Sequence, residues 1–127
     1  MKKFIAKIKS VIIGMMLFAA AVFSSFASPA EQRHNQQRFC SEVSSMAGMI
    51  MHQRQTGASL SVTLDQFDRM TYNNPTIRTL MRSIIMQAYS RPAYSTAEVR
   101  NREIREFENT QMLMCMKAFE SRPLGRS

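Results

Sequence analysis

The clearest hydrophobic pattern in the chain lies between residues 75 and 90. Apolar side chains recur there every three or four positions, at Ile77, Leu80, Met81, Ile84, Ile85 and Ala88. This spacing places them on one face of an α-helix, whose period is 3.6 residues. Asn74 and Pro75 favour a helix start, as N-cap and first helical residue, and Arg91-Pro92 favours a helix end. The segment is predicted to be an amphipathic helix.

A second pattern predicts a helix over about residues 32–56. Its apolar face consists of Phe39, Val43, Met46, Ala47, Ile50 and Met51. Gly57 is expected to end this helix, because glycine takes a left-handed backbone conformation without a Cβ clash. Gly48 lies inside the helix, where glycine costs about 1 kcal/mol relative to alanine. We therefore expect another helix to approach closely at Gly48.

The last amphipathic segment runs over about residues 95–120. The apolar arc consists of Ala97, Ile104, Phe107, Gln111, Cys115, Ala118 and Phe119. Ser95 and Glu98 have the spacing of a capping box at its start. A shorter helix is predicted between residues 59 and 73, with Leu60, Leu64, Phe67 and either Met70 or Thr71 on one side. No segment has a strand pattern, so the sequence predicts an all-α fold, a small bundle of about four helices.

The first 27 residues have the pattern of a secretory signal. Four lysines precede an apolar run over residues 11–26, and small residues follow at Ser25 and Ala27. The run is shorter than the roughly 20 residues that span a bilayer. We predict cleavage after Ala27, with Ala30 as the second choice. The expected products are a signal peptide, residues 1–27, and a single helical domain, residues 28–127, with a loose tail from about residue 122. The predicted location is periplasmic or secreted, with no transmembrane span after cleavage.

Two cysteines, Cys40 and Cys115, remain in the predicted mature part. In an exported chain two cysteines most often pair with each other. They lie near the start of the first helix and near the end of the last, on or beside the apolar faces. A disulfide between them therefore predicts that these helices are antiparallel. In such a pair the residue numbers of two facing positions should add up to about 155, the sum of 40 and 115. This sets Ala47 and Gly48 opposite Glu108 and Phe107.

The charge of the predicted mature part is modest. The whole chain has 17 basic and 9 acidic residues, and four of the basic residues lie in the signal segment. The mature part therefore has 13 basic and 9 acidic residues, a net charge of +4. This charge is small and scattered, so no nucleic-acid partner is predicted.

Several short motifs recur in a known group of proteins. They are Ile84-Ile85-x-x-Ala88-Tyr89-x-x-Pro92-x-Tyr94-Ser95-Thr96-x-Glu98, Phe107-x-Asn109 with Cys115, and Arg54-Gln55-Thr56-Gly57 after an early cysteine. With these motifs the chain resembles a group of short exported helical proteins from Gram-negative bacteria and their phages. The resemblance implies export, a helical fold and a disulfide. It implies no active site, because the group has no assigned function.

Methionine is frequent in the predicted mature part, with nine residues. Thioether and imidazole groups suit copper, but methionine also fills irregular cores. Met46 and Met51 lie on an apolar face, and Met112 and Met114 flank one, which indicates packing. Met49, His52 and Met116 do not lie on the apolar faces of the predicted helices. The sequence predicts no cofactor and no metal site, and these three residues are the candidates for copper.

No catalytic residues are predicted. The chain has neither the Gly-x-Ser-x-Gly nor the His-Glu-x-x-His motif. His34 and His52 are separated by about 27 Å along one predicted helix, at 1.5 Å per residue, so they cannot share a site. The sequence therefore favours a protein that is not an enzyme.

The favoured hypothesis is an exported interaction module, which binds an envelope protein or surface that the sequence does not identify. It is based on apolar residues off the core faces, namely Met49, Met86, Val99 and Leu113. One alternative is a methionine-rich copper binder. Another is a small periplasmic stress chaperone, in which neutralised carboxylates would loosen the fold.

Overall fold

The computed structural model describes residues 28–122, and every regular element in this range is a helix. The helices are α2 (Pro29–Gln55), α3 (Leu60–Met70), α4 (Pro75–Tyr89) and α5 (Ala97–Glu120). The predicted signal peptide and the predicted tail beyond Arg122 lie outside the described residues. Residues up to Arg33 belong to a separate unit, so the bundle described below comprises residues 34–122. No helix in the described range has an apolar stretch long enough to cross a membrane.

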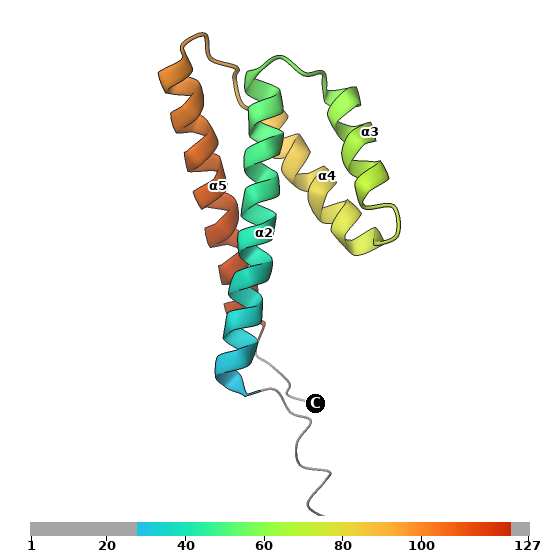
Figure 1. Cartoon of the computed structure of the whole chain (residues 1–127), viewed down its shortest axis with the longest axis vertical. Helices are drawn as coiled ribbons and strands as arrows, with labels where there is room; N and C mark the ends of the chain where they lie inside the picture. Colours follow the sequence, from blue (N-terminus) through green and yellow to red (C-terminus); the bar gives the residue numbers. More distant parts are fainter. Residues whose placement is uncertain (1–27, 123–127) are drawn as a thin grey trace, which may run out of the picture. The chain divides into compact units, whose positions relative to one another are not determined.

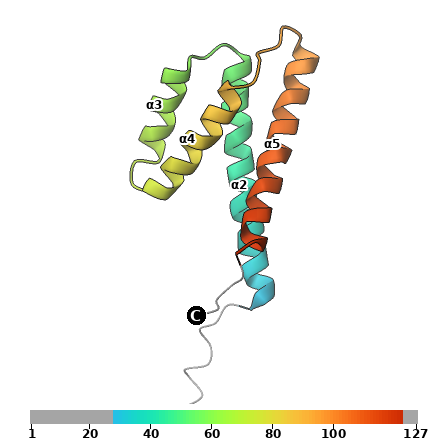
Figure 2. The ribbon, with the colours of Figure 1, turned by 180° about the vertical axis from the view of Figure 1, so that it is seen from behind.

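The first and last helices form an antiparallel pair. Figures 1 and 2 show α5 running beside α2 in the opposite direction, while α3 and α4 form a hairpin that covers the C-terminal half of α2. A disulfide joins Cys40 to Cys115, with 5.6 Å between their Cα atoms. The predicted all-α bundle, with its first and last helices antiparallel and joined by a disulfide, is confirmed.

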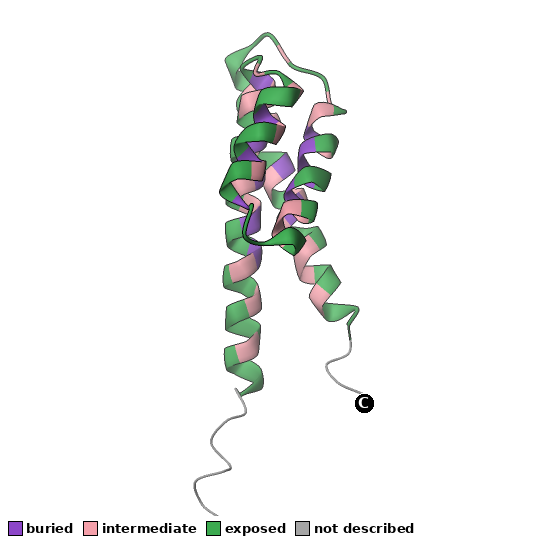
Figure 3. Ribbon diagram, turned by 90° about the vertical axis from the view of Figure 1, so that its right-hand side faces the viewer, coloured by how far each residue is buried: buried purple, intermediate pink, exposed green. Residues whose placement is uncertain are grey.

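The hydrophobic core lies where all four helices meet. Figure 3 shows the buried positions concentrated there, whereas toward the start of α2 and the end of α5 most positions are half-buried or exposed. The buried apolar side chains of the core are Val43, Ala47, Ile50, Met51, Phe67, Met81, Ile84, Ile85, Ala88 and Phe107. The apolar stripe of α4 contributes four of these residues, as its periodicity predicts.

Capping groups define three helix ends. Gly57, with φ of +89°, ends α2. The N–H of Ala58 donates to the carbonyl of Gln53, and the N–H of Gly57 donates to that of Arg54, which is a Schellman motif. The Asn74 side chain accepts a hydrogen bond from the Ile77 N–H, so the predicted cap of α4 is confirmed. Ser59 caps α3 in the same manner.

The predicted capping box at Ser95 is wrong. The N-cap of α5 is Thr96, and its side chain makes no capping hydrogen bond. The helix begins one residue later than the box requires, so Glu98 occupies the second helical position rather than the third. A carboxylate at the second position has the wrong register to reach back to the cap N–H.

Gly48 permits the close approach of α5. A Cβ atom on Gly48 would lie 1.8 Å from Oε1 and 2.7 Å from Cγ of Glu108. Nearby, the Ser44 hydroxyl donates to the Glu108 carbonyl at 2.9 Å. The predicted pairing of α2 with α5 is thus correct to within one residue, since Gly48 rather than Ala47 lies against Glu108. Phe107 is instead fully buried in the core.

Candidate functional site

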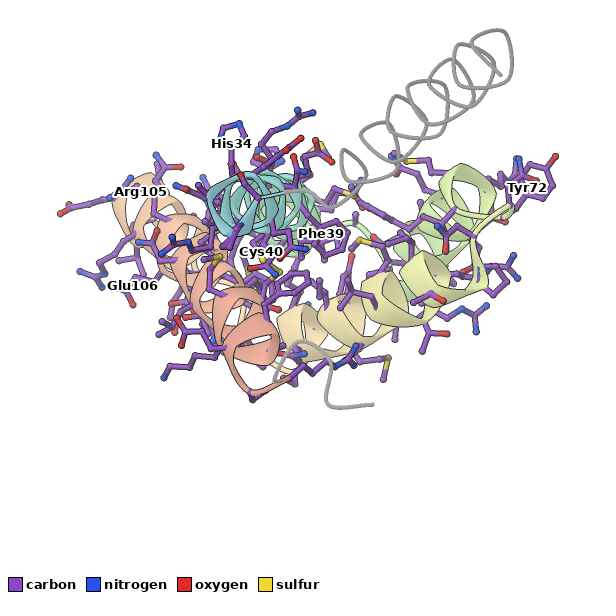
Figure 4. All side chains as sticks on the ribbon, turned by 90° about the horizontal axis from the view of Figure 1, so that it is seen from below. His34, Phe39, Cys40, Tyr72, Arg105 and Glu106 are labelled. Carbon is purple, nitrogen blue, oxygen red and sulfur yellow. A yellow bond between two sulfur atoms is a disulfide. The ribbon has the colours of Figure 1, made fainter. Side chains whose placement is uncertain are left out.

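An apolar groove runs between α4 and α5, with α2 at its base. Its apolar lining consists of Phe39, Val43, Ile77, Leu80, Ile84, Met114, Ala118 and Phe119, beside Cys115 of the disulfide. Figure 4 looks along this end of the bundle and shows Phe39 pointing inward from α2, whereas His34 and Tyr72 point outward. The groove is therefore bounded by α2 and by the consecutive helices α4 and α5.

The groove begins where α4 and α5 are bonded to each other. The Gln111 side-chain amide donates to Oε1 of Gln87 at 3.0 Å, and Gln111 is only 4% exposed. From this bond α4 inclines away from α5 toward Thr76 (Figure 2). The lining continues along α5 and just past its end to Arg122, eleven residues beyond Gln111, a length of about 16 Å at 1.5 Å per residue. The groove thus extends over three helical turns.

Two contacts hold the base of the groove against α5. The Phe39 and Phe119 rings pack edge to face, with 5.9 Å between their centroids. The adjacent disulfide links the same two helices. Both contacts join α2 to α5 and neither involves α4, whose side-chain bond to α5 at the groove is the one between Gln87 and Gln111.

The groove carries little charge. Its polar lining residues are Thr76, Ser83, Gln87, Gln111 and Arg122. Among the described lining residues Arg122 alone is charged, and it lies at the end farthest from Gln111. A complementary ligand is therefore apolar along most of its length, with an anionic group near Arg122.

The apolar residues that the sequence placed off the core faces do not line this groove. Met49, Met86 and Leu113 are exposed, at 50%, 56% and 54%, and Val99 is half-buried. The groove is built instead from residues that the sequence assigned to the core, such as Leu80 and Phe119. These stay partly uncovered because α4 is shorter than α2 and α5 and diverges from α5.

The copper candidates lie in two places. Met49 and His52 line a shallow hollow between α2 and α5, together with Glu108. Met116 does not line this hollow, because it lies two turns farther along α5. Within residues 28–122 no group of three His, Cys, Asp or Glu side chains has the arrangement of a metal site. Helical spacing could not assign Glu108 to this hollow, because Glu108 comes from a different helix than Met49 and His52.

The other methionines mostly serve packing. Met51 and Met81 are buried, and Met46 is half-buried against the core. Met112 is half-buried, whereas Met114 is half exposed at the groove. The two histidines, His34 and His52, are both exposed.

Two of the recurring motifs meet at the C-terminal end of α2. The Gln55 amide donates to the Pro92 carbonyl at 2.9 Å, and its oxygen accepts from the Tyr94 N–H at 2.9 Å. Beside it, the Arg54 Nε donates to the Arg91 carbonyl at 3.0 Å. The segment Arg54–Gly57 thus binds the loop between α4 and α5, which makes these motif residues structural.

Tyr89 extends this network to α3. Its hydroxyl donates to the Ala58 carbonyl at 2.8 Å and lies 2.7 Å from the Thr63 hydroxyl. The single proton of the Thr63 hydroxyl is shared between the Tyr89 oxygen and the Gln53 side-chain oxygen, which is also 2.7 Å away, and Thr63 is fully buried. The Arg54 guanidinium lies 5.5 Å from the centre of the Tyr89 ring. The head of the Arg54 side chain is therefore held by the Arg91 carbonyl and the Tyr89 ring.

Charged pairs stabilise the outside of the bundle. Arg91 binds Glu103 at 2.7 Å and stacks over the Phe107 ring. On α3 and α4, Asp68 accepts two hydrogen bonds from Arg82. This hydrogen bonding, together with the positive charges of Arg82 and Arg78, lowers the pKa of Asp68 below its ordinary value of 3.8 and outweighs the opposing effect of desolvation. The same pairing raises the pKa of Arg82.

Comparison with known proteins found no matching family model, no similar curated protein and no similar solved structure. Function is therefore inferred from the groove and the hollow themselves.

Proposed function

We propose that this chain is an exported, non-enzymatic binding module whose groove between α4 and α5 receives an amphipathic helix of an envelope protein. The observation that carries this proposal is the apolar groove with Arg122 as its one charged lining residue in the described range. Export is supported by the signal-like pattern of residues 1–27. It is also supported by the disulfide, because such bonds persist in oxidising compartments.

The length and walls of the groove suit a helix. Three turns of a partner helix would present apolar side chains at spacings of three and four to the exposed parts of Phe39, Leu80 and Phe119. The walls of the groove are themselves helices, and helix ridges pack into helix grooves. Such a partner helix would cover the open side of the groove, opposite α2.

The charge distribution specifies the partner further. An acidic side chain at the end of the partner helix near Arg122 would complete an ion pair at the rim. At the opposite end, the Gln111 side chain is nearly buried, and within residues 28–122 its amide nitrogen donates a hydrogen bond to Gln87. The Gln111 oxygen is therefore available to a donor on the partner.

Site-specific photocrosslinking in the envelope tests this proposal. A photoreactive amino acid replaces Ser83, which lines the groove, or Arg69, which is exposed on α3. We expect Ser83 to form an adduct with one protein and Arg69 to form none with it. Mass spectrometry should place the crosslink in an amphipathic segment of that protein, and the matching synthetic peptide should become helical on binding.

A groove-filling variant provides the control. Ala118→Trp places a large ring in the groove, and Ala118 is exposed, so the core should be undisturbed. We expect this variant to melt like the wild type and to lose the peptide. Peptide binding that is insensitive to Ala118→Trp, or equal adducts from Ser83 and Arg69, would rule out the groove as the binding site. An adduct with lipid alone would show that an acyl chain occupies it.

A further inference from the structure

The hollow on α2 and α5 brings together three side chains that bind metals. Met49 and His52 are three residues apart, so they emerge about one turn apart on the same side of α2. Glu108 of α5 lines the same hollow. Residues that carry a thioether, an imidazole and a carboxylate therefore border one hollow from two helices.

The absence of a side chain at Gly48 leaves the space that the Glu108 side chain occupies. Glu108 Oε1 lies only 1.8 Å from the position that a Cβ atom of residue 48 would take. The carboxylate thus rests against the backbone of α2, next to Met49 and one turn before His52. The hydrogen bond from the Ser44 hydroxyl to the Glu108 carbonyl fixes the position of α5 along α2 at this point.

Glu108 is half-buried, and its carboxylate has no ion pair within the part of the chain that the structure describes. Carboxylate oxygens are ligands for cations in proteins. Ser45, His52 and Gln53 border the same hollow, but within residues 28–122 the Gln53 side chain is bonded to Gln66 and Thr63 rather than to this carboxylate. A metal cation would satisfy this carboxylate.

The donor set selects the metal. Calcium and magnesium prefer oxygen ligands alone, and zinc takes imidazole and carboxylate but rarely a thioether. Copper binds nitrogen and oxygen ligands most tightly among the divalent first-row metals, and its reduced form favours thioethers. We propose that Met49, His52 and Glu108 form a copper-binding site. This site does not depend on the groove, and Glu108 takes the place of Met116 in the set of ligands.

The surroundings limit the affinity of the site. Arg100 lines an adjacent hollow that also includes His52. Its positive charge opposes a cation at this place, whereas Glu108 is the one acid that lines the first hollow among the described residues. With three protein ligands and an open side, the site should exchange copper with solution rather than retain it through purification.

Titration of the disulfide-intact mature protein with copper(II) sulfate tests the proposal. We expect one equivalent to bind with nitrogen coordination in the electron paramagnetic resonance spectrum. His52→Ala should weaken binding about tenfold or more, a loss of the size caused by altering groups around metal ligands. Glu108→Gln should also weaken it, and Met49→Leu should chiefly weaken copper(I) binding, measured by competition with a chromophoric chelator.

Matched variants distinguish this site from general copper binding. His34→Ala and Met86→Leu remove exposed side chains of the same types elsewhere, and both should bind copper like the wild type. Gly48→Ala displaces the Glu108 carboxylate and should behave like Glu108→Gln. Copper binding that survives His52→Ala unchanged, or that falls equally in His34→Ala, would refute the site. So would the absence of a one-equivalent phase in the wild type.

Discussion

Gln55 and Tyr94 are joined by a hydrogen bond that spans 39 positions of the sequence, from the Tyr94 N–H to the Gln55 side-chain oxygen at 2.9 Å. The same amide donates to the Pro92 carbonyl. Gln55 is 4% exposed, so these bonds are formed largely away from water. They fix the loop between α4 and α5 and thereby the point at which α5 begins.

Replacing Gln55 should destabilise the bundle. Gln55→Ala leaves the Tyr94 N–H and the Pro92 carbonyl without partners, and each loss of this kind costs about 1–3 kcal/mol. We expect the free energy of unfolding to fall by roughly 2–4 kcal/mol, measured by chemical denaturation. Gln37→Ala, at an exposed position of α2, should have no measurable effect. Equal denaturation midpoints for the two variants would contradict the structural role of Gln55.

Gly48 and Glu108 should be energetically coupled. Alanine at position 48 gains about 1 kcal/mol in helix propensity, but its Cβ atom collides with the Glu108 side chain. In the Glu108→Ala background the collision is absent, so Gly48→Ala should stabilise by about 1 kcal/mol. In the wild-type background the gain should be smaller or reversed. A double-mutant cycle from denaturation curves measures the coupling, and additive effects would disprove the contact.

Two methionines should respond differently to truncation. Met81 is 1% exposed in the core, and Met49 is 50% exposed on α2. Met81→Ala should lower the free energy of unfolding by roughly 2–5 kcal/mol, as for other buried large-to-small changes. Met49→Ala should be nearly silent in the same assay without copper. If both variants melt alike, the assignment of one of these helix faces is wrong.

Reduction of the disulfide should greatly destabilise the protein. The bridge joins residues separated by 75 positions, and a loop of this length contributes about 4–5 kcal/mol on the chain-entropy account. That is comparable to the whole stability of a small domain, about 5–15 kcal/mol. Circular dichroism with and without reductant should show a large drop in melting temperature or loss of helix. A Cys40→Ala/Cys115→Ala variant that melts within a few degrees of the oxidised protein would disprove this.

Acid should remove the contribution of Asp68 to the stability of the folded protein. Its pKa in the folded protein is lowered below 3.8 by Arg82, so the ionised pair stabilises the fold in full above that value. The contribution disappears as the pH falls through the lower, folded pKa. The melting temperatures of the wild type and Asp68→Asn should therefore differ near neutrality and converge at low pH.

Asp65→Asn removes a surface acid whose pair with Arg69 is exposed, and it serves as the reference for this experiment. Exposed pairs of this kind contribute little to stability, so its melting temperature should differ less from that of the wild type at every pH. A constant gap between the wild type and Asp68→Asn down to strong acid would contradict the pairing with Arg82.

Much of the fold could be predicted because apolar periodicity and capping residues report local structure. The stripe of α4, its Asn74 cap and the Gly57 end of α2 are all confirmed. Polar residues with tertiary roles could not be found in this way. Thr63, Gln55 and Gln111 are buried because distant backbone and side chains satisfy their hydrogen bonds. Nothing in their immediate sequence signals those partners.

The candidate sites were harder to predict than the helices. The groove depends on the angle between α4 and α5 and on the shortness of α4, and neither can be read from a periodic pattern. For the hollow, helical spacing identified Met49 and His52 as candidates. Glu108 joins them through the packing of α5 on α2, where its side chain lies against Gly48.

The link between Cys40 and Cys115 turns the intervening chain into a covalent ring. The whole of α3 and α4, and the turn of residues 71–74 between them, lies within that ring. A protease that cleaves one peptide bond in this turn opens the ring but releases no fragment, because the sulfur bridge still joins both pieces. After such a nick the core residues of α2, α4 and α5 remain parts of a single molecule, so the groove can survive damage that would divide an unbridged bundle.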